Sequence, residues 1–150
     1  NLINKFDLFY VEDPFMEDSF TSFARLRDEA ETCIICSDDL TATNIERISY
    51  GASIKAFDAV IIKPNQVGTL SDTISAIHTT FSYGLIPVCS HRSGETIDVF
   101  LSHLAVATGS PMVKCGIMGG ERISKLNEFI RIEEDLGEWG TIFELERLLK

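Results

Sequence analysis

Five short apolar runs in this chain each end in a charged or polar side chain that packing alone does not require. The residues at these ends are Glu12, Asp38, Lys63, His91 and Lys114. Their numbers differ in turn by 26, 25, 28 and 23, a period of about 25 residues. Such a period is typical of consecutive β-strand and α-helix units around a parallel sheet. Ligands bind where the carboxyl ends of parallel strands meet, so we expect these ends to form a site.

The order of the charges along the chain indicates a particular chemistry. Glu12 and Asp38 come first and offer the hard oxygen ligands that Mg²⁺ prefers. Lys63, Arg92 and Lys114 would lie across the same rim and suit a substrate with several negative charges. Removal of a proton next to a carboxylate needs this combination, because a metal stabilises the dianion that forms and a lysine accepts the proton. Cationic neighbours and Mg²⁺ would lower the pKa of that lysine towards neutrality, as a general base requires.

The segment Ser90–Thr96 carries a second group of functional side chains. It follows an apolar run and precedes a helical pattern that begins near Glu95. A strand would therefore deliver the imidazole of His91, the guanidinium of Arg92 and the hydroxyl of Ser93 onto a turn at a helix N-terminus. Such a turn is suited to binding an anion.

Each of these residues also has a purely structural interpretation. The acidic pairs at residues 12–13 and 38–39 are suitable for turns and helix caps, and the lysines could extend from strand ends into solvent. His91 could be a structural histidine and Ser93 an N-cap. It is the joint order, with carboxylates first and cations after, that favours a functional site.

A competing motif is the acidic pair and Lys-Pro of receiver domains in phosphorelay signalling. There the acidic pair ends the first strand and Lys-Pro the fifth, whereas here one strand and helix unit separates residues 38–39 from Lys63-Pro64. The spacing therefore excludes a receiver domain. His78 and His103 lie within predicted helices, and we assign both to the helix surface or to packing.

The composition favours a small anionic ligand over a large polyanion. The chain carries 13 basic and 23 acidic residues, a formal charge of −10. An acidic surface disfavours nucleic acid and anionic membranes as partners, whereas a local cluster of cations still attracts a small anion. Because no apolar run approaches the roughly 20 residues that span a bilayer, we expect a cytoplasmic protein.

Four cysteines occur without a disulfide pattern, at positions 33, 36, 89 and 115. The spacing of Cys33 and Cys36 matches a redox or zinc half-motif, but the pair lies in an apolar strand pattern and has no second pair. We therefore expect buried, reduced thiols, as is usual in cytosolic proteins.

Hydrophobic periodicity predicts the elements that position these side chains, with one unit of strand and helix per period. Strands are expected at residues 8–11, 33–37, 59–63, 85–89 and 112–114. Helices are expected at residues 18–31, 43–55, 70–83, 95–108, 121–136 and 141–150. We expect a capping box at residues 43–46 and a cap at Thr69. The predicted fold class is α/β, in a single domain that spans residues 1–150.

The length limits how complete that domain can be. A closed eight-stranded barrel of strand and helix units typically needs about 250 residues. The 150 residues here accommodate five units and not eight. Because the chain begins at Asn1 without a methionine and enters its first strand almost at once, we expect it to be the C-terminal part of something larger.

Six blocks of sequence together resemble the enolase family, the glycolytic phosphopyruvate hydratases. The blocks are Val11–Phe15, Asp38–Asn44, Ile62–Gly68, Ser90–Thr96, Val113–Gly116 and Arg131–Gly137, in the family's order and spacing. The resemblance extends from about Leu8 to Gly137 and implies the last five units of a (β/α)₈ barrel, without the N-terminal domain and first strands. A lysine base beside Mg²⁺ is an established pattern of the enolase superfamily.

The resemblance implies a role for four of the strand-end residues. Glu12 and Asp38 would bind the catalytic Mg²⁺. Lys63 would be the general base that removes the C2 proton of 2-phosphoglycerate on the way to phosphoenolpyruvate. Lys114 would contact the substrate carboxylate and stabilise the aci-carboxylate intermediate.

The resemblance also assigns the segment after the fourth strand to the substrate. His91, Arg92 and Ser93 match the family's substrate-contacting residues, with Arg92 and Ser93 towards the phosphate and His91 counted among the catalytic residues as well. The family's third metal-binding aspartate and the acidic residues that protonate the leaving group would lie upstream of Asn1. We therefore expect little or no activity from these 150 residues alone.

Two departures from the family pattern bear on turnover. Pro64 stands where an aliphatic residue follows the base, and residues 117–120 replace an Ala-Pro turn after Lys114. Small shifts of either lysine would affect catalysis more than ligand binding.

Two alternatives remain open. One is a non-catalytic, truncated enolase paralogue that binds anions or assembles with itself, because the strands at residues 6–11 and 112–114 would leave two sheet edges unpaired and favour a homo-oligomer. The other is a member of the enolase superfamily that acts on other acids. The phosphate-side segment Ser90–Thr96 argues against the second.

Overall fold

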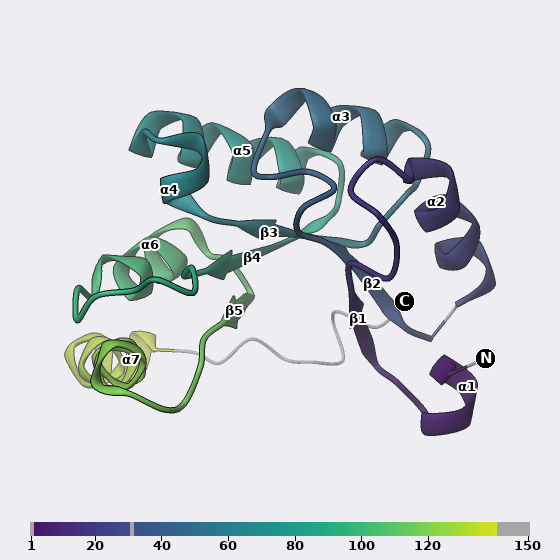
Figure 1. The fold of residues 1–150 in the computed structure, drawn as a ribbon. Helices are drawn as coiled ribbons and strands as arrows, with labels where there is room; N and C mark the ends of the chain where they lie inside the picture. The colour runs from purple at the N-terminus through teal and green to yellow at the C-terminus, as the bar shows by residue number, and fades with distance from the viewer. Residues whose placement is uncertain (1, 31, 141–150) are drawn as a thin grey trace.

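A curved sheet of five parallel strands organises the molecule, a computed structural model that describes residues 2–30 and 32–140. The strands are β1 (Tyr10–Glu12), β2 (Ile34–Ser37), β3 (Ala59–Ile62), β4 (Ile86–Ser90) and β5 (Met112–Lys114). They are arranged in chain order and each pairs in parallel with the next. Figure 1 shows the sheet curling as part of a barrel wall, with the longer helices along its outer side. The expected α/β fold of five strand and helix units is confirmed.

Helices lie between successive strands, and one further helix precedes β1 and another follows β5. Their bounds are α1 (Leu2–Phe6), α2 (Phe20–Glu29), α3 (Ile45–Ser53), α4 (Pro64–Val67), α5 (Leu70–Ser82), α6 (Phe100–Thr108) and α7 (Gly120–Leu136), with a 3₁₀ turn at Gly137–Trp139. Thr69 caps α5 as predicted, its hydroxyl accepting from Asp72 N at 3.0 Å. The short helices α1 and α4 were not predicted, and the helix expected at residues 141–150 lies outside the described part of the chain.

The capping box predicted at residues 43–46 is wrong. Asn44 is the N-cap of α3, because its side chain accepts from Arg47 N at 3.0 Å. The hydroxyl of Thr43 instead accepts from Lys63 N at 2.9 Å and donates to Gln66. Thr43 therefore supports the carboxyl end of β3, where a predicted site residue stands.

The helix predicted from residue 95 begins five residues later, at Phe100. The side chain of Glu95 turns back to its neighbour Thr96 N, and Asp98 Oδ1 accepts from Phe100 N at 2.8 Å. Ile97, expected on the buried face, is 76% exposed. Ser90–Thr96 is therefore a loop that precedes the helix by several residues, and the prediction that it lies at a helix N-terminus is wrong.

Side chains alternate across the sheet and fill two separate cores. The outer face of β2 and β3 contributes residues such as Ile35 and Val60 to a large cluster with Phe23 of α2 and Phe57 of the loop before β3. The inner face has its own cluster, formed by Ile34, Cys36, Ala59, Ile61 and Val88. Every residue of β3 is buried, as predicted for a strand covered on both faces.

This alternation also shows whether the cysteines can pair with one another. Cys33 and Cys36 belong to different clusters on opposite faces of the sheet, so they cannot form a disulfide or bind one metal together. All four cysteines are free thiols, as expected, but only Cys33, Cys36 and Cys89 are buried, and Cys115, expected to be buried too, is half-buried. Across residues 2–30 and 32–140, no helix is both long and apolar enough to cross a membrane.

Candidate functional site

The carboxyl ends of the strands bring four predicted site residues into one group. Lys63 Nζ donates to both carboxylate oxygens of Asp38, at 2.7 and 2.6 Å. Lys114 Nζ donates to Glu12 and lies 3.8 Å from Asp38 Oδ2. Since β1 and β5 are the two outermost strands, the Lys114–Glu12 contact spans the concave side of the curved sheet. The structure thus brings these carboxylates and lysines together at one edge of the sheet, and their functional roles stay a prediction.

The two ion pairs differ in burial. The side chains of Lys63 and Asp38 are only 12% and 9% exposed, whereas that of Lys114 is 48% exposed. Burial by itself lowers the pKa of Lys114, but the hydrogen bond and charge of Glu12, together with the charge of Asp38, raise that pKa above its usual value. Lys114 is therefore a stable cation at neutral pH, suited to holding a negative charge.

The two carboxylates converge on a point that a cation can reach. The single ammonium of Lys114 contacts Glu12 and approaches Asp38, so oxygens from both strands face one position. Oxygen ligands on rigid strand ends are the donor set that Mg²⁺ takes in proteins. These two side chains consequently fit a divalent cation.

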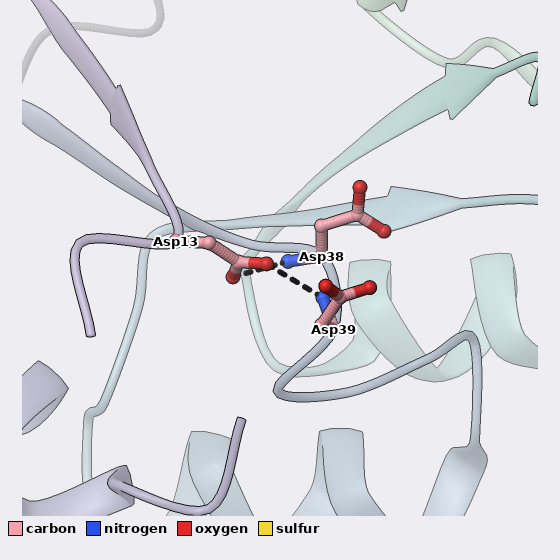
Figure 2. Close-up of side chains that lie close together, drawn as sticks. All are labelled: Asp13, Asp38 and Asp39. Carbon is pink, nitrogen blue, oxygen red and sulfur yellow. Dashed lines mark hydrogen bonds between the residues drawn. The ribbon is translucent and has the colours of Figure 1, made fainter. Parts of the chain in front are cut away.

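A third carboxylate, Asp13, has a different task. It lies close to Asp38 and Asp39, and the three offer oxygens within 4.8 Å of one another. Its oxygens accept hydrogen bonds from the backbone nitrogens of Asp38 and Asp39, at 2.9 and 2.8 Å. Figure 2 shows these two bonds, with the Asp38 carboxylate pointing away from Asp13. Asp13 therefore positions the loop that carries Asp38.

The predicted anion-binding residues lie beside this group and not within it. His91 Nε2 accepts from Gly116 N at 3.1 Å, so the ring proton is on Nδ1, which donates to Arg92 O at 2.7 Å. The imidazole is thus neutral and links the loops after β4 and β5. Arg92 and Ser93 are exposed, and within the described residues no hydrogen bond or ion pair joins their side chains to the four charged residues.

Sequence reasoning missed one charged residue near this loop. Lys125 in α7 is buried, and its ammonium donates to the carbonyls of Thr96 and Asp98 at 2.8 and 2.7 Å. It stands between Ile123 and Leu126 in the helical pattern, and nothing in its neighbours indicates that the lysine, and not Ile123, faces the interior. The other two histidines lie where expected, with His78 exposed and His103 paired with Glu128 on the surface.

Comparison with known proteins gives one consistent result. Residues 1–146 match the family described as "Enolase, C-terminal TIM barrel domain". Similar curated proteins are enolases of Pyrobaculum aerophilum, 50% identical over 144 residues, Methanosphaera stadtmanae, 50% over 137, and Natronomonas pharaonis, 51% over 134. These alignments cover 96%, 91% and 89% of the chain but 34%, 33% and 34% of the relatives. The chain therefore spans about a third of the length of the curated relatives it matches.

Proposed function

The chain belongs to the enolase family, and from that premise we propose that it supplies the last five strand ends of an active site that dehydrates 2-phosphoglycerate to phosphoenolpyruvate. We also propose that residues 1–150 form one partial barrel domain. The observation that carries the proposal is the convergence of Glu12, Asp38, Lys63 and Lys114 at one edge of the sheet. The free thiols suit a reducing compartment, and we propose the cytoplasm.

Glu12 and Asp38 would hold Mg²⁺. When bound, the metal would supply positive charge beside the substrate carboxylate and so make the neighbouring carbon more acidic. Their place at the ends of adjacent strands β1 and β2 supports this assignment, because rigid backbone there keeps the two carboxylates at a constant separation.

Lys63 would act as the general base for the C2 proton. It can accept that proton only as a neutral amine, and its ammonium here donates to both oxygens of Asp38. The Lys63 side chain must therefore lose a proton and leave Asp38 before it acts. Lys114, a cation held beside Glu12, would contact the substrate carboxylate and stabilise the charge that develops on it.

Arg92 and Ser93 would bind the phosphate from the adjacent loop. Both side chains are exposed and available to a ligand. A guanidinium and a hydroxyl together suit phosphate, which accepts several hydrogen bonds. His91 would contribute through its neutral ring, which here joins the loops on either side of the phosphate position.

A hybrid enzyme tests the proposal. The matching third of the Pyrobaculum aerophilum enolase is replaced by this chain, and phosphoenolpyruvate formation is followed with Mg²⁺ and 2-phosphoglycerate. The hybrid should turn over, whereas its Lys63→Ala variant should lose activity by about a hundredfold to ten-thousandfold, the usual contribution of a general base. Arg131→Met, which changes an exposed cation on α7, is the matched control. An active hybrid in which Lys63→Ala has no effect would exclude the assigned base.

The isolated chain is a separate arm of the same assay. We expect no turnover from it, because it spans about a third of its relatives' length. Robust Mg²⁺-dependent turnover by residues 1–150 alone would overturn that expectation.

A second candidate function is a non-catalytic module that binds anions and assembles with itself. It is favoured by one observation: β1 and β5 lie at the two ends of the sheet, each paired with a single neighbour in the described structure. Unpaired strand edges favour pairing with another chain.

A further inference from the structure

Lys125 is the most deeply buried charged residue that the structure describes, and the proposed chemistry makes no use of it. Its exposed fraction is 2%, and among the described charged residues only Asp38 is also buried. Lysine is rarely buried unless its ammonium is fully hydrogen-bonded, because an unpaired charge inside a protein is strongly unfavourable. The contacts of this ammonium therefore show what keeps it in place.

The ammonium of Lys125 has three donors, and three backbone carbonyls accept them. Nζ lies 2.8 Å from Thr96 O, 2.7 Å from Asp98 O and 2.9 Å from Glu121 O. A carboxylate oxygen of Glu95 lies 3.5 Å away and supplies the opposite charge. Two of the three carbonyls belong to the loop between β4 and α6, so a side chain from α7 holds that loop at two points.

Two neighbouring contacts hold the same loop from the same side. Arg122, one turn before Lys125 on α7, donates through its guanidinium to Ser93 O at 3.3 Å. Gly116, which precedes α7, donates its N–H to His91 Nε2. The loop is thus restrained from the α7 side near its start, its middle and its end, with Lys125 providing the buried, charged contact.

We propose that Lys125 is a positioning residue for the anion-binding loop. It holds the carbonyls of Thr96 and Asp98, and through them it sets where His91, Arg92 and Ser93 stand beside the charged strand ends. Only the use of Arg92 and Ser93 as phosphate ligands rests on the proposed function. The restraint on the loop is independent of it. The same contacts delay the start of α6, because two carbonyls that could begin a helix face the ammonium instead.

The test is the state of the His91 ring in Lys125→Met, measured by ¹⁵N NMR of the ligand-free chain. Methionine matches the length of lysine but cannot donate to carbonyls. In the unchanged chain the ¹⁵N chemical shifts of the His91 ring should be those of a protonated Nδ1 and an unprotonated Nε2. The signals that disappear in His91→Gln identify this ring. In Lys125→Met we expect loss of that single tautomer and a shift of the Gly116 amide, while the amides of β2 and β3 remain unchanged. Arg131→Met on the same helix should leave all of them unchanged.

A lysine that only stabilised the core would lower the overall stability and leave the His91 tautomer as it was, and that result would overturn the proposal. If Lys125→Met does not fold, the proposal is tested on the unchanged chain instead. The Lys125 ammonium protons should exchange slowly with water and show nuclear Overhauser contacts to residues 96–98, and absence of these contacts would equally overturn it.

The proposed function can fail separately. Every readout above is taken without a ligand, so the tautomer change in a chain whose hybrid shows no turnover would support the positioning role and count against the enolase chemistry.

Discussion

At the scale of single residues, Asp13 has the clearest supporting role. Its two carboxylate oxygens accept hydrogen bonds from the backbone N–H groups of Asp38 and Asp39. Its own N–H donates to Cys36 O at 3.1 Å. It adopts a positive φ of 42°, a conformation unfavourable for a residue other than glycine. Such a backbone is retained only where the surrounding contacts stabilise it, and here those contacts hold the loop that carries Asp38.

Asp13→Ala should loosen that loop. Each hydrogen bond to a charged group contributes about 1.5–3 kcal/mol, so we expect exchange of the Asp38 and Asp39 amides to accelerate about tenfold or more. Hydrogen exchange followed by NMR measures both amides directly. The matched control is Asp39→Asn, which changes an exposed carboxylate but retains the backbone N–H group that donates to Asp13. Equal exchange rates in the two variants would show that Asp13 does not hold the loop.

Cys89 gives a pH-dependent prediction. Burial raises the pKa of this thiol above its ordinary value of 9.0, although a hydrogen bond to Ser110 partly opposes the shift. Above about pH 9 the unfolded chain loses the thiol proton while the folded chain keeps it. The unfolded state is then increasingly favoured, and stability that is fully present below pH 9 is lost as the pH rises.

Denaturant titrations of the unchanged chain and Cys89→Ala between pH 7 and pH 10 measure this effect. The stability difference between them should change above pH 9 by up to about 1.4 kcal/mol per pH unit, with the unchanged chain losing more. The difference in unfolding free energy at pH 7 measures the stability lost by replacing the thiol with a smaller side chain, which does not depend on pH. A difference that stays constant to pH 10 would show that the buried thiol does not couple folding to pH.

The shared edge of the four charged residues could be predicted from sequence, but their pairing could not. The 25-residue period and the apolar runs place Glu12, Asp38, Lys63 and Lys114 at the carboxyl ends of strands in one parallel sheet. Which ammonium meets which carboxylate depends on side-chain rotamers and on the curvature that brings β5 towards β1. Neither is encoded in local spacing.

At the scale of elements, the strands were easier to predict than the start of α6. Each strand is a short apolar run with a charged end, and the predicted bounds agree with the structure within two residues. The apolar positions before α6 continue the helical pattern through Ile97, so local sequence predicts an earlier start. The deciding contact comes from Lys125, 25 or more residues later in the chain, and periodicity carries no information about it.

Packing of α3 against the sheet depends on Gly51, which sequence alone marks only as a weak point in the helix. A Cβ at this position would lie 2.3 and 2.6 Å from two ring atoms of Phe57, a fully buried side chain. Gly51→Ala gains about 1 kcal/mol in helix propensity, but overpacking costs about 1–3 kcal/mol, so we expect a net loss of up to about 2 kcal/mol.

The measurement for Gly51→Ala is chemical denaturation in two backgrounds. With Phe57 present the substitution should destabilise, whereas in a Phe57→Leu background, which leaves room for the methyl group, the same substitution should be neutral or stabilising. If alanine is equally unfavourable in both backgrounds, contact with the Phe57 ring is not the reason for glycine.

At the scale of the whole molecule, the two ends of the sheet favour association between copies of the chain, whereas the large negative charge opposes it. The outer sides of β1 and β5, which pair with no other strand among residues 2–30 and 32–140, offer backbone groups for pairing with another chain. The formal charge of −10 repels copies from one another. Salt screens that repulsion, with a Debye length of about 10 Å at 0.1 M and about 3 Å at 1 M. Association through strand edges should therefore increase with salt, whereas association through ion pairs between copies would decrease.

Light scattering on size-exclusion fractions, over a series of protein and salt concentrations, tests this prediction. We expect residues 1–150 to form oligomers whose share rises with both concentrations. The matched control is the hybrid enolase, in which the relative's remaining strands would cover the same two edges and remove the salt-dependent association. A monomer at every salt concentration would contradict edge pairing, and an equal rise in the hybrid would place the contact on a surface other than the sheet edges. If the isolated chain associates and the hybrid does not, the same two edges close the barrel in the hybrid and pair with other copies in the isolated chain. The catalytic and the assembly proposals then describe one surface with two different partners.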